Sequence, residues 1–118
     1  MSVSIQNPVQ LNDFSEPEPD ICILNQPTLA YLQKTPQADD IQLLIEVADT
    51  TLKYDLNTKA MNYASNKVMR YWVISIQEKR LYDHQTPTPE GYQNIVIHDI
   101  TATSELEIAS GLKLVIGY

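Results

Sequence analysis

The stretch that decides the fold is IQLLIEVA, at residues 41–48. This run is largely apolar, and Glu46 is its only charged residue. An apolar run of this length is typical of a central strand that is covered on both faces of a sheet. Burying an unpaired carboxylate inside such a strand costs several kcal/mol of folding free energy unless a cation or a proton neutralises its charge. We therefore predict a sheet built around this strand and a partner for Glu46.

A helix is predicted to follow this strand. Apolar residues recur there every four positions, at Leu56, Ala60 and Ala64. This period indicates a helix over residues 55–66. Asp55, Lys59 and Tyr63 each precede one member of the stripe, so they form a polar row at the edge of its buried face.

Strands are expected on both sides of this strand and helix. The candidate ranges are 3–5 with Val9, 21–24 beginning at Asp20, 71–76, 81–84, 92–98 and, more weakly, 105–115 around Gly111. Residues 77–80 are expected to be a turn, and residues 31–40 to be irregular or one short helix. The proline-rich stretches 16–19 and 86–91 are expected to be loops. The order of elements indicates an α/β or α+β domain with a mixed sheet, spanning residues 1–118 as a single unit.

Length and composition exclude several classes of protein. A chain of 118 residues with 43% hydrophobic residues fits one domain with a core. The apolar run at residues 71–76 is far shorter than the ~20 residues that span a bilayer, so no membrane protein is expected. The N-terminus lacks the pattern of a secretion signal, which favours a cytoplasmic protein. Three glycines leave no room for a glycine-rich phosphate loop.

Isolated residues with reactive side chains have ordinary structural interpretations. Cys22 is the single cysteine and stands in an apolar run, so we interpret it as a core residue. His84 and His98 have no neighbours at the spacing of a zinc site, and we interpret both as strand positions. Tyr71 and Trp72 begin an apolar strand and are expected in the core.

Charge is distributed unevenly along the chain. The net charge is −7, which argues against a non-specific nucleic-acid binder. Residues 51–80 nevertheless hold six bases and two acids. Solvated helix and turn positions explain this basic segment, but it could also face a phosphate.

Two carboxylates are expected near each other if the strands at 21–24 and 41–48 pair. Asp20 and Glu46 would then meet at neighbouring strand ends, with the oxygen ligands that magnesium prefers. In the alternative interpretation, Glu46 pairs with a lysine and Asp20 caps a turn. Lys59 could aim its ammonium group at the carboxylates to position or deprotonate a water, or could form an ordinary pair with Asp55 on a solvated helix face. The residues alone leave these alternatives open.

Several stretches together resemble a known family, the Uma-type restriction endonucleases of the PD-(D/E)xK nuclease superfamily. They are Pro19-Asp20, residues 43–52 (LLIEVADTTL), Tyr54-Asp55, Lys59, Tyr63-Ala64 and residues 71–74 (YWVI), with residues 5–11, 15–17 and 88–92 on the flanks. The ordered set covers roughly residues 3–95 and is far more specific than any one piece.

The resemblance implies a restriction-endonuclease-like fold and metal-dependent hydrolysis of DNA. By that resemblance, Asp20 and Glu46 would hold Mg²⁺ or Mn²⁺ as catalytic residues. The superfamily's usual lysine position is Ala48 here, and Lys59 on the helix is expected to serve instead as the third catalytic residue. Asp55 would hold Lys59 or a water, and Tyr63 would support the same face.

The chain departs from the family pattern in three places. The usual N-terminal helical segment is missing, so we expect either a homodimer that covers an open apolar sheet face, or an inactive, truncated protein that serves as an interaction or oligomerisation module. Lys67 stands where the family mostly has a glycine, at a position that often requires a left-handed backbone. Arg70 replaces a common glutamate.

Overall fold

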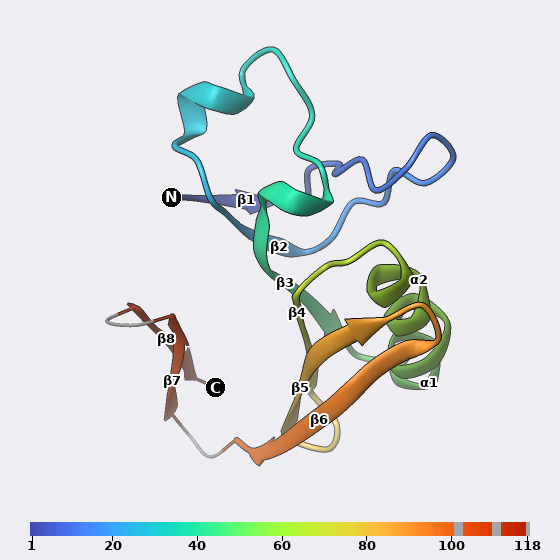
Figure 1. The fold of residues 1–118 in the computed structure, drawn as a ribbon. Coiled ribbons are helices and arrows are strands. Elements are labelled where there is room, and N and C mark those ends of the chain that lie inside the picture. The colour runs from blue at the N-terminus through green and yellow to red at the C-terminus, as the bar shows by residue number, and fades with distance from the viewer. Residues whose placement is uncertain (101–102, 110–111, 118) are drawn as a thin grey trace.

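A six-stranded mixed sheet is the centre of the molecule. The computed structural model describes residues 1–100, 103–109 and 112–117. The strands lie in chain order across the sheet (Figure 1): β1 (Ser2–Ile5), β2 (Ile21–Leu24), β3 (Ile41–Ala48), β4 (Arg70–Ser75), β5 (Arg80–Thr88) and β6 (Gly91–Asp99). β3 and β4 are parallel, and the other neighbours are antiparallel. This sheet with its flanking helix is an α+β fold consistent with the predicted restriction-endonuclease-like class.

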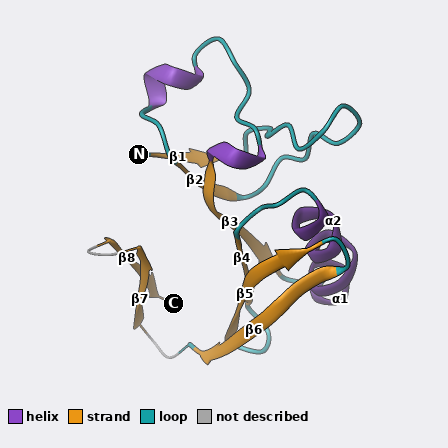
Figure 2. Cartoon of the chain, viewed as in Figure 1, coloured by secondary structure: helices purple, strands orange, loops and turns teal. Residues whose placement is uncertain are grey.

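The helical segment joins the one parallel pair, which needs a crossover connection. It comprises α1 (Leu52–Tyr54), a π-helical turn (Asp55–Lys59) and α2 (Ala60–Ser65), seen as one continuous coil in Figure 2. The helix therefore begins three residues earlier than residues 55–66 predicted and ends one residue earlier. The early start has a local cause, because the Asp55 N–H already donates to the Thr51 carbonyl at 2.9 Å.

The helix ends in a left-handed residue, as the sequence predicted. Lys67 has φ 64°. Its N–H donates to the Ala64 carbonyl at 3.0 Å, and the Val68 N–H donates to the Tyr63 carbonyl at 3.0 Å. These two bonds form a Schellman motif, in which the left-handed position is most favourable for glycine.

Apolar side chains of the sheet alternate between two core layers. On the helix side, Leu44 and Tyr71 pack with Ala60 and Tyr63. On the opposite side the core members are Ile23, Leu43, Ile45, Trp72, Leu81 and Ile100. β3 is therefore covered on both faces, as predicted, and Tyr71 and Trp72 are core residues.

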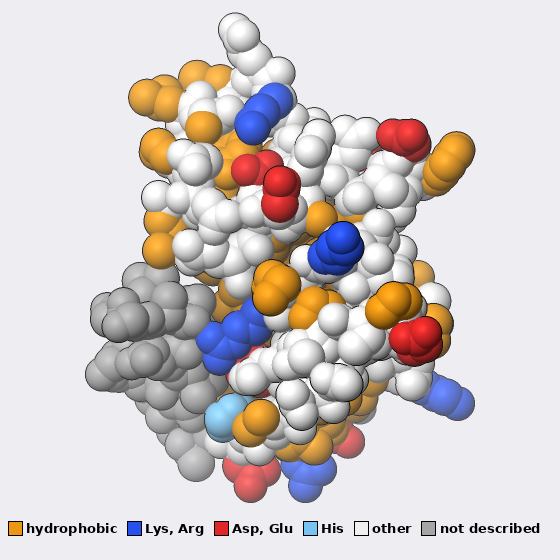
Figure 3. Space-filling model, viewed as in Figure 1, with side chains coloured by type: hydrophobic (Ala, Val, Ile, Leu, Met, Phe, Trp, Pro, Cys, Tyr) orange, Lys and Arg blue, Asp and Glu red, His pale blue; other side chains and the backbone are white. Residues whose placement is uncertain are grey.

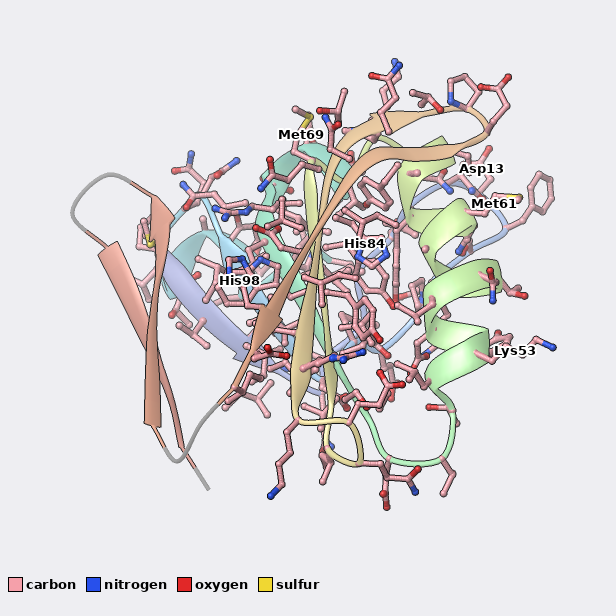
Figure 4. The ribbon with its side chains drawn as sticks, turned by 90° about the horizontal axis from the view of Figure 1, so that it is seen from below. Asp13, Lys53, Met61, Met69, His84 and His98 are labelled. Atoms are coloured by element: carbon pink, nitrogen blue, oxygen red, sulfur yellow. The ribbon has the colours of Figure 1, made fainter. Side chains whose placement is uncertain are left out.

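The sheet face opposite the helix is covered at its centre, whereas Val3 and Ile5 of β1 stay exposed on it. Leu43 is 0% exposed and Trp72 is 1% exposed. The strands β7 (Thr103–Ala109) and β8 (Leu112–Gly117) form an antiparallel hairpin on this side of the sheet, as Figures 1 and 4 show. The expectation of an open apolar sheet face is therefore wrong for these core positions. The predicted weak strand around Gly111 becomes two strands, while Gly111 itself lies outside the described residues.

Other expectations differ at the ends of elements. Val9 is buried but lies outside any strand. Residues 31–40 include the end of one short 3-10 helix, Thr28–Tyr31, and the whole of another, Ala38–Asp40, with irregular structure between them. The predicted loop at 86–91 shrinks to residues 89–90, because β5 and β6 continue to Thr88 and from Gly91. Pro87 is tolerated in β5 because the pairing with β4 stops at Gln85, so the missing N–H breaks no bond of that ladder.

The expectations for three more single residues are confirmed. Cys22 is a core residue at 1% exposure, and burial raises the pKa of its thiol to about 12. His84 and His98 both lie in strands, β5 and β6 respectively. No helix in the described part of the chain is both long and apolar enough to cross a membrane.

Candidate active site

Two carboxylates meet where the β2–β3 ladder ends. The last antiparallel pair joins Ile21 to Ile45, which places Asp20 opposite Glu46 one step further along. The Asp20 N–H donates to Glu46 Oε1 at 3.3 Å, and the Val47 N–H donates to Asp20 Oδ2 at 2.7 Å. The carboxylate of Asp20 thus accepts a backbone N–H of β3 beyond the last paired residue of β2. Register therefore holds the two acids side by side.

The helix delivers a lysine to the same point. Lys59 Nζ lies 2.5 Å from Glu46 Oε2 and 3.5 Å from Asp55 Oδ1. Its side chain keeps 32% exposure, whereas the Glu46 side chain keeps 7%. The ammonium group therefore stands between a buried carboxylate and solvent, where a ligand from outside can reach it.

Asp55 is the fixed support of this lysine. Its side chain is 2% exposed, and its Oδ2 accepts a hydrogen bond from the Thr51 hydroxyl at 2.8 Å. Its backbone carbonyl accepts a hydrogen bond from the Tyr71 hydroxyl at 3.1 Å. The first turn of the helical segment is thus tied to β4, and Lys59 projects from a rigid base.

Tyr63 lies behind the cluster rather than in it. Its side chain is buried, and its ring centroid is 4.9 Å from that of Tyr71. Burial, followed by the charge of Glu46, raises the pKa of the Tyr63 hydroxyl, which keeps it neutral. Tyr63 therefore packs against the tyrosine that holds Asp55, as a supporting residue one layer inward.

The electrostatic balance of the cluster is negative. Burial raises the pKa of Glu46, Lys59 opposes that effect, and the charges of Asp20 and Asp55 add to it. For Lys59, burial lowers the pKa, but the hydrogen bond and charge of Glu46 outweigh burial, and the pKa is raised overall. Lys59 is therefore a cation at neutral pH. Glu46 and Asp55 flank the ammonium group of Lys59, and Asp20 lies beside Glu46, so the cluster has an excess of negative charge that a divalent cation would balance.

The donor set fits magnesium or manganese better than zinc. Among the described residues, no three side chains of His, Cys, Asp or Glu are grouped so that they could hold a metal ion. Mg²⁺ does not need such a cage, because it is commonly held by one or two carboxylates, with waters and substrate phosphates completing its shell. Asp20 and Glu46 supply those two carboxylates. Glu46 Oε2 would have to exchange its bond with Lys59 for a bond to the ion.

A second tyrosine at the site has no counterpart in the sequence interpretation. The Tyr54 ring is half exposed, and Lys59 Nζ lies 5.8 Å from its centroid, within cation–π range. Thr51, which holds Asp55, was also not predicted. Its position four residues before Asp55 is the available signal, since residues at that spacing share a helix face. A shallow surface hollow of about 560 Å³ adjoins these residues, lined by Thr50, Thr51, Lys53, Tyr54, Asn57 and Thr58.

Three other bases of residues 51–80, Lys53, Arg70 and Arg80, do not gather at the cluster. Arg70 forms a two-pronged pair with the buried carboxylate of Asp83, through Nε at 3.2 Å and Nη2 at 2.9 Å. Arg80 lies 3.4 Å from Asp99. Lys53 projects away from the helix in Figure 4, and the Lys and Arg side chains in the view of Figure 3 are scattered. The basic segment is therefore not one continuous patch on that face.

His84 is buried away from the carboxylates, in a cluster of tyrosines. Its Nδ1 lies 3.1 Å from the carbonyl oxygens of both Tyr71 and Tyr82. Because both partners are acceptors, Nδ1 carries the hydrogen of a neutral ring. The position of His84 between the strands and the helix is visible in Figure 4. It is a structural residue of β5, in line with the sequence interpretation.

The comparisons with known proteins agree with the resemblance. The family model Uma2, described as "Putative restriction endonuclease", matches residues 1–117. No curated protein gives a significant match.

Proposed function

Since this chain belongs to the Uma2 family, we propose that it is a metal-dependent endonuclease that hydrolyses phosphodiester bonds in DNA. The observation that supports this function is the convergence of Asp20, Glu46 and Lys59 at one point on the rim of the sheet. Residues that lie 26 and 13 positions apart in the chain meet there. Family membership supports the nuclease class, and this geometry supplies the groups that the chemistry needs.

The two carboxylates are the proposed metal ligands. Asp20 and Glu46 would hold Mg²⁺ or Mn²⁺ through oxygens that now accept N–H hydrogen bonds from Asp20, Val47 and Lys59. When bound, such an ion lowers the pKa of a water molecule and stabilises negative charge on the phosphoryl and leaving oxygens. Burial of Glu46 strengthens its attraction to a cation, because little water screens it.

Lys59 is the proposed group at the reacting phosphate. Its raised pKa keeps it protonated, so in the metal-free protein it acts as a hydrogen-bond donor and a positive charge rather than as a base. With a cation held by Asp20 and Glu46, Lys59 would orient the attacking water or donate to a phosphate oxygen. Asp55 and Thr51 keep it in place.

Plasmid nicking tests the proposal directly. We expect the purified protein to nick supercoiled DNA with Mg²⁺ or Mn²⁺ and not with a chelator. Asp20→Asn, Glu46→Gln and Lys59→Ala should each abolish nicking. Lys53→Ala is the matched control, because it removes a lysine from the same helical segment that points away from the protein (Figure 4), and it should nick normally. Normal nicking by the three site variants would contradict the assignment.

Thermal melting with metal gives a second readout that does not depend on activity. A ligand that binds only the folded state raises the melting temperature. We expect Mn²⁺ at about 100 times its Kd to stabilise the wild type by about 2.7 kcal/mol, and to stabilise Glu46→Gln much less. No shift in the wild type would argue against a metal site.

A second candidate function is a nuclease-fold protein that has lost catalysis and serves as an interaction or oligomerisation module. One observation favours it: Glu46 already pairs with Lys59, as the structural alternative for Glu46 requires. Asp20 does not cap a turn as that alternative expected, because its carboxylate accepts the Val47 N–H of β3. A folded wild type that neither nicks DNA nor binds Mn²⁺ would support this candidate over the nuclease.

A further inference from the structure

The strand β6 forms one edge of the main sheet, and large apolar side chains are exposed along it. It is nine residues long and follows β5 as the last strand in the order of that sheet. Three consecutive side chains are exposed at its centre: Ile95 by 49%, Val96 by 44% and Ile97 by 55%. Because neighbours in a strand point to opposite faces, both faces of this edge are apolar.

Proteins usually protect such an edge against pairing with another chain. The common devices are a short strand, a lysine, a proline or a bulge. The opposite edge, β1, is only four residues long. Residues 92–99 (YQNIVIHD) contain no lysine, proline or glycine, and their register with β5 shows no shift. β6 is therefore long, regular and unprotected, as a strand that accepts a partner would be.

The sequence of β6 identifies the partner, because its pattern is symmetric about Val96. On each side of Val96 comes one isoleucine, Ile95 or Ile97, and then one polar residue, Asn94 or His98. We propose that β6 pairs antiparallel with β6 of a second copy of this chain, with Val96 on the two-fold axis. A two-fold contact joins the same surface of both copies, so the surface must complement itself.

This register places apolar residues opposite apolar ones and polar residues opposite polar ones over residues 93–99. Ile95 of each copy lies opposite Ile97 of the other, Asn94 opposite His98, and Gln93 opposite Asp99. Like charges directly opposite each other would destabilise the pair, and this register contains none. The free backbone groups of both edges form ladder hydrogen bonds, and the two sheets become one continuous sheet.

The proposed dimer also orients the two clusters that contain Glu46. Opposite residues of an antiparallel pair point to the same face, so both copies present the same face of the sheet on the same side. Across the sheet, Ile95 of β6 lies in one row of paired residues with His84, Tyr71 and Leu44. Leu44 and Glu46 are two positions apart in β3 and therefore point to the same face, so Ile95 lies on the face of Glu46. Both clusters therefore lie on the same side of the joined sheet, an arrangement suited to the two strands of one duplex. This last step alone rests on the proposed function.

Light scattering after size exclusion tests the dimer without reference to activity. We expect the wild type to have twice the 13.4 kDa mass of one chain. Val96→Lys places two lysines on the axis and should give the mass of one chain with an unchanged circular dichroism spectrum. Val3→Lys is the matched control, because Val3 is 61% exposed on the other edge, and it should remain a dimer. A monomeric wild type, or a dimeric Val96→Lys, would overturn the proposal.

Disulfide formation tests the register and does not depend on the lysine variant folding. Directly paired residues of an antiparallel ladder have Cα atoms about 4.5–5.5 Å apart, within the range of a disulfide. Val96→Cys should therefore give a covalent dimer under mild oxidation, and Val3→Cys should not. Cys22 does not compete, since it is buried and its thiol pKa is raised to about 12. Val96→Cys that stays a monomer on a non-reducing gel would overturn this register.

Discussion

Replacing Lys59 by methionine should destabilise the metal-free protein through Glu46. The substitution keeps the length and apolar stem of the side chain but removes the ammonium group 2.5 Å from Glu46 Oε2. Breaking a fully buried pair costs about 3–5 kcal/mol, because a charge is left buried without a partner. Lys59 is one-third exposed, so water replaces part of its effect. We expect a loss of about 2 kcal/mol, which lowers the melting temperature by about 8 °C in a chain of this length.

The loss should depend on pH with a definite sign. Burial raises the pKa of Glu46 and Lys59 holds that rise back, so Lys59→Met lets the pKa rise further. A carboxyl group with a raised pKa binds its proton more tightly in the folded protein than in the unfolded chain. Stability is then lost as the pH rises from the ordinary carboxyl value through the raised one. The difference in free energy of unfolding between wild type and Lys59→Met should be larger at about pH 8 than at about pH 5.

Urea unfolding of a double-mutant cycle measures this effect. Glu46→Gln removes the charge that Lys59 balances, so adding it to Lys59→Met should restore part of the lost stability. Lys53→Met controls for the removal of a lysine from the same helical segment and should stay within about 0.5 kcal/mol of wild type. The reasoning is refuted if Lys59→Met is as stable as wild type, or if Glu46→Gln lowers its stability further.

Two further predictions concern residues outside the site. Lys67→Gly should raise the free energy of unfolding by about 0.5–1 kcal/mol, because glycine adopts the left-handed backbone at φ 64° without strain, although its greater freedom in the unfolded chain reduces the gain. Urea unfolding measures this, with Lys67→Ala as the control for the lost charge. A Gly variant that is no more stable than the Ala variant would contradict the prediction. Burial lowers the pKa of His84 against the opposing carbonyl hydrogen bonds and the charge of Asp83, so the unfolded chain binds the proton more tightly and stability should fall as the pH drops below the ordinary histidine value. His84→Phe should remove up to about 1.4 kcal/mol per pH unit of that dependence, and an equal slope in both proteins would rule out His84 as its source.

The sequence predicted best those elements whose apolar residues, as spaced along the chain, are also the residues that are buried in the fold. The run at residues 41–48 is the two-sided strand β3, and the stripe of Leu56, Ala60 and Ala64 packs toward the sheet as a helix. Local sequence signals gave the wrong element where the position of a residue in the sheet changes how much it destabilises a strand. Pro87 predicted a loop, yet β5 has only one strand neighbour there, so its missing N–H is harmless.

The site divides in the same way. The apolar surroundings of Glu46 predicted a partner for it, and spacing placed Asp55, Lys59 and Tyr63 on one helix row. The structure separates that row: Lys59 and Asp55 stand at the carboxylates, while Tyr63 lies in the core against Tyr71. Spacing alone could not make this distinction, because it gives the face of a helix but not its distance from the sheet.

The sequence by itself determined the fold class and the residue types able to act together, because periodicity and the cost of burying a charge are local properties of the chain. Only the tertiary structure decided that Asp20 stands opposite Glu46, since a register shift of one residue in β2 would turn Asp20 to the other face. Only the tertiary structure left Ile95, Val96 and Ile97 on an edge that pairs with no other described strand. Both outcomes depend on which strands become neighbours, and that choice is made by the packing of the whole sheet.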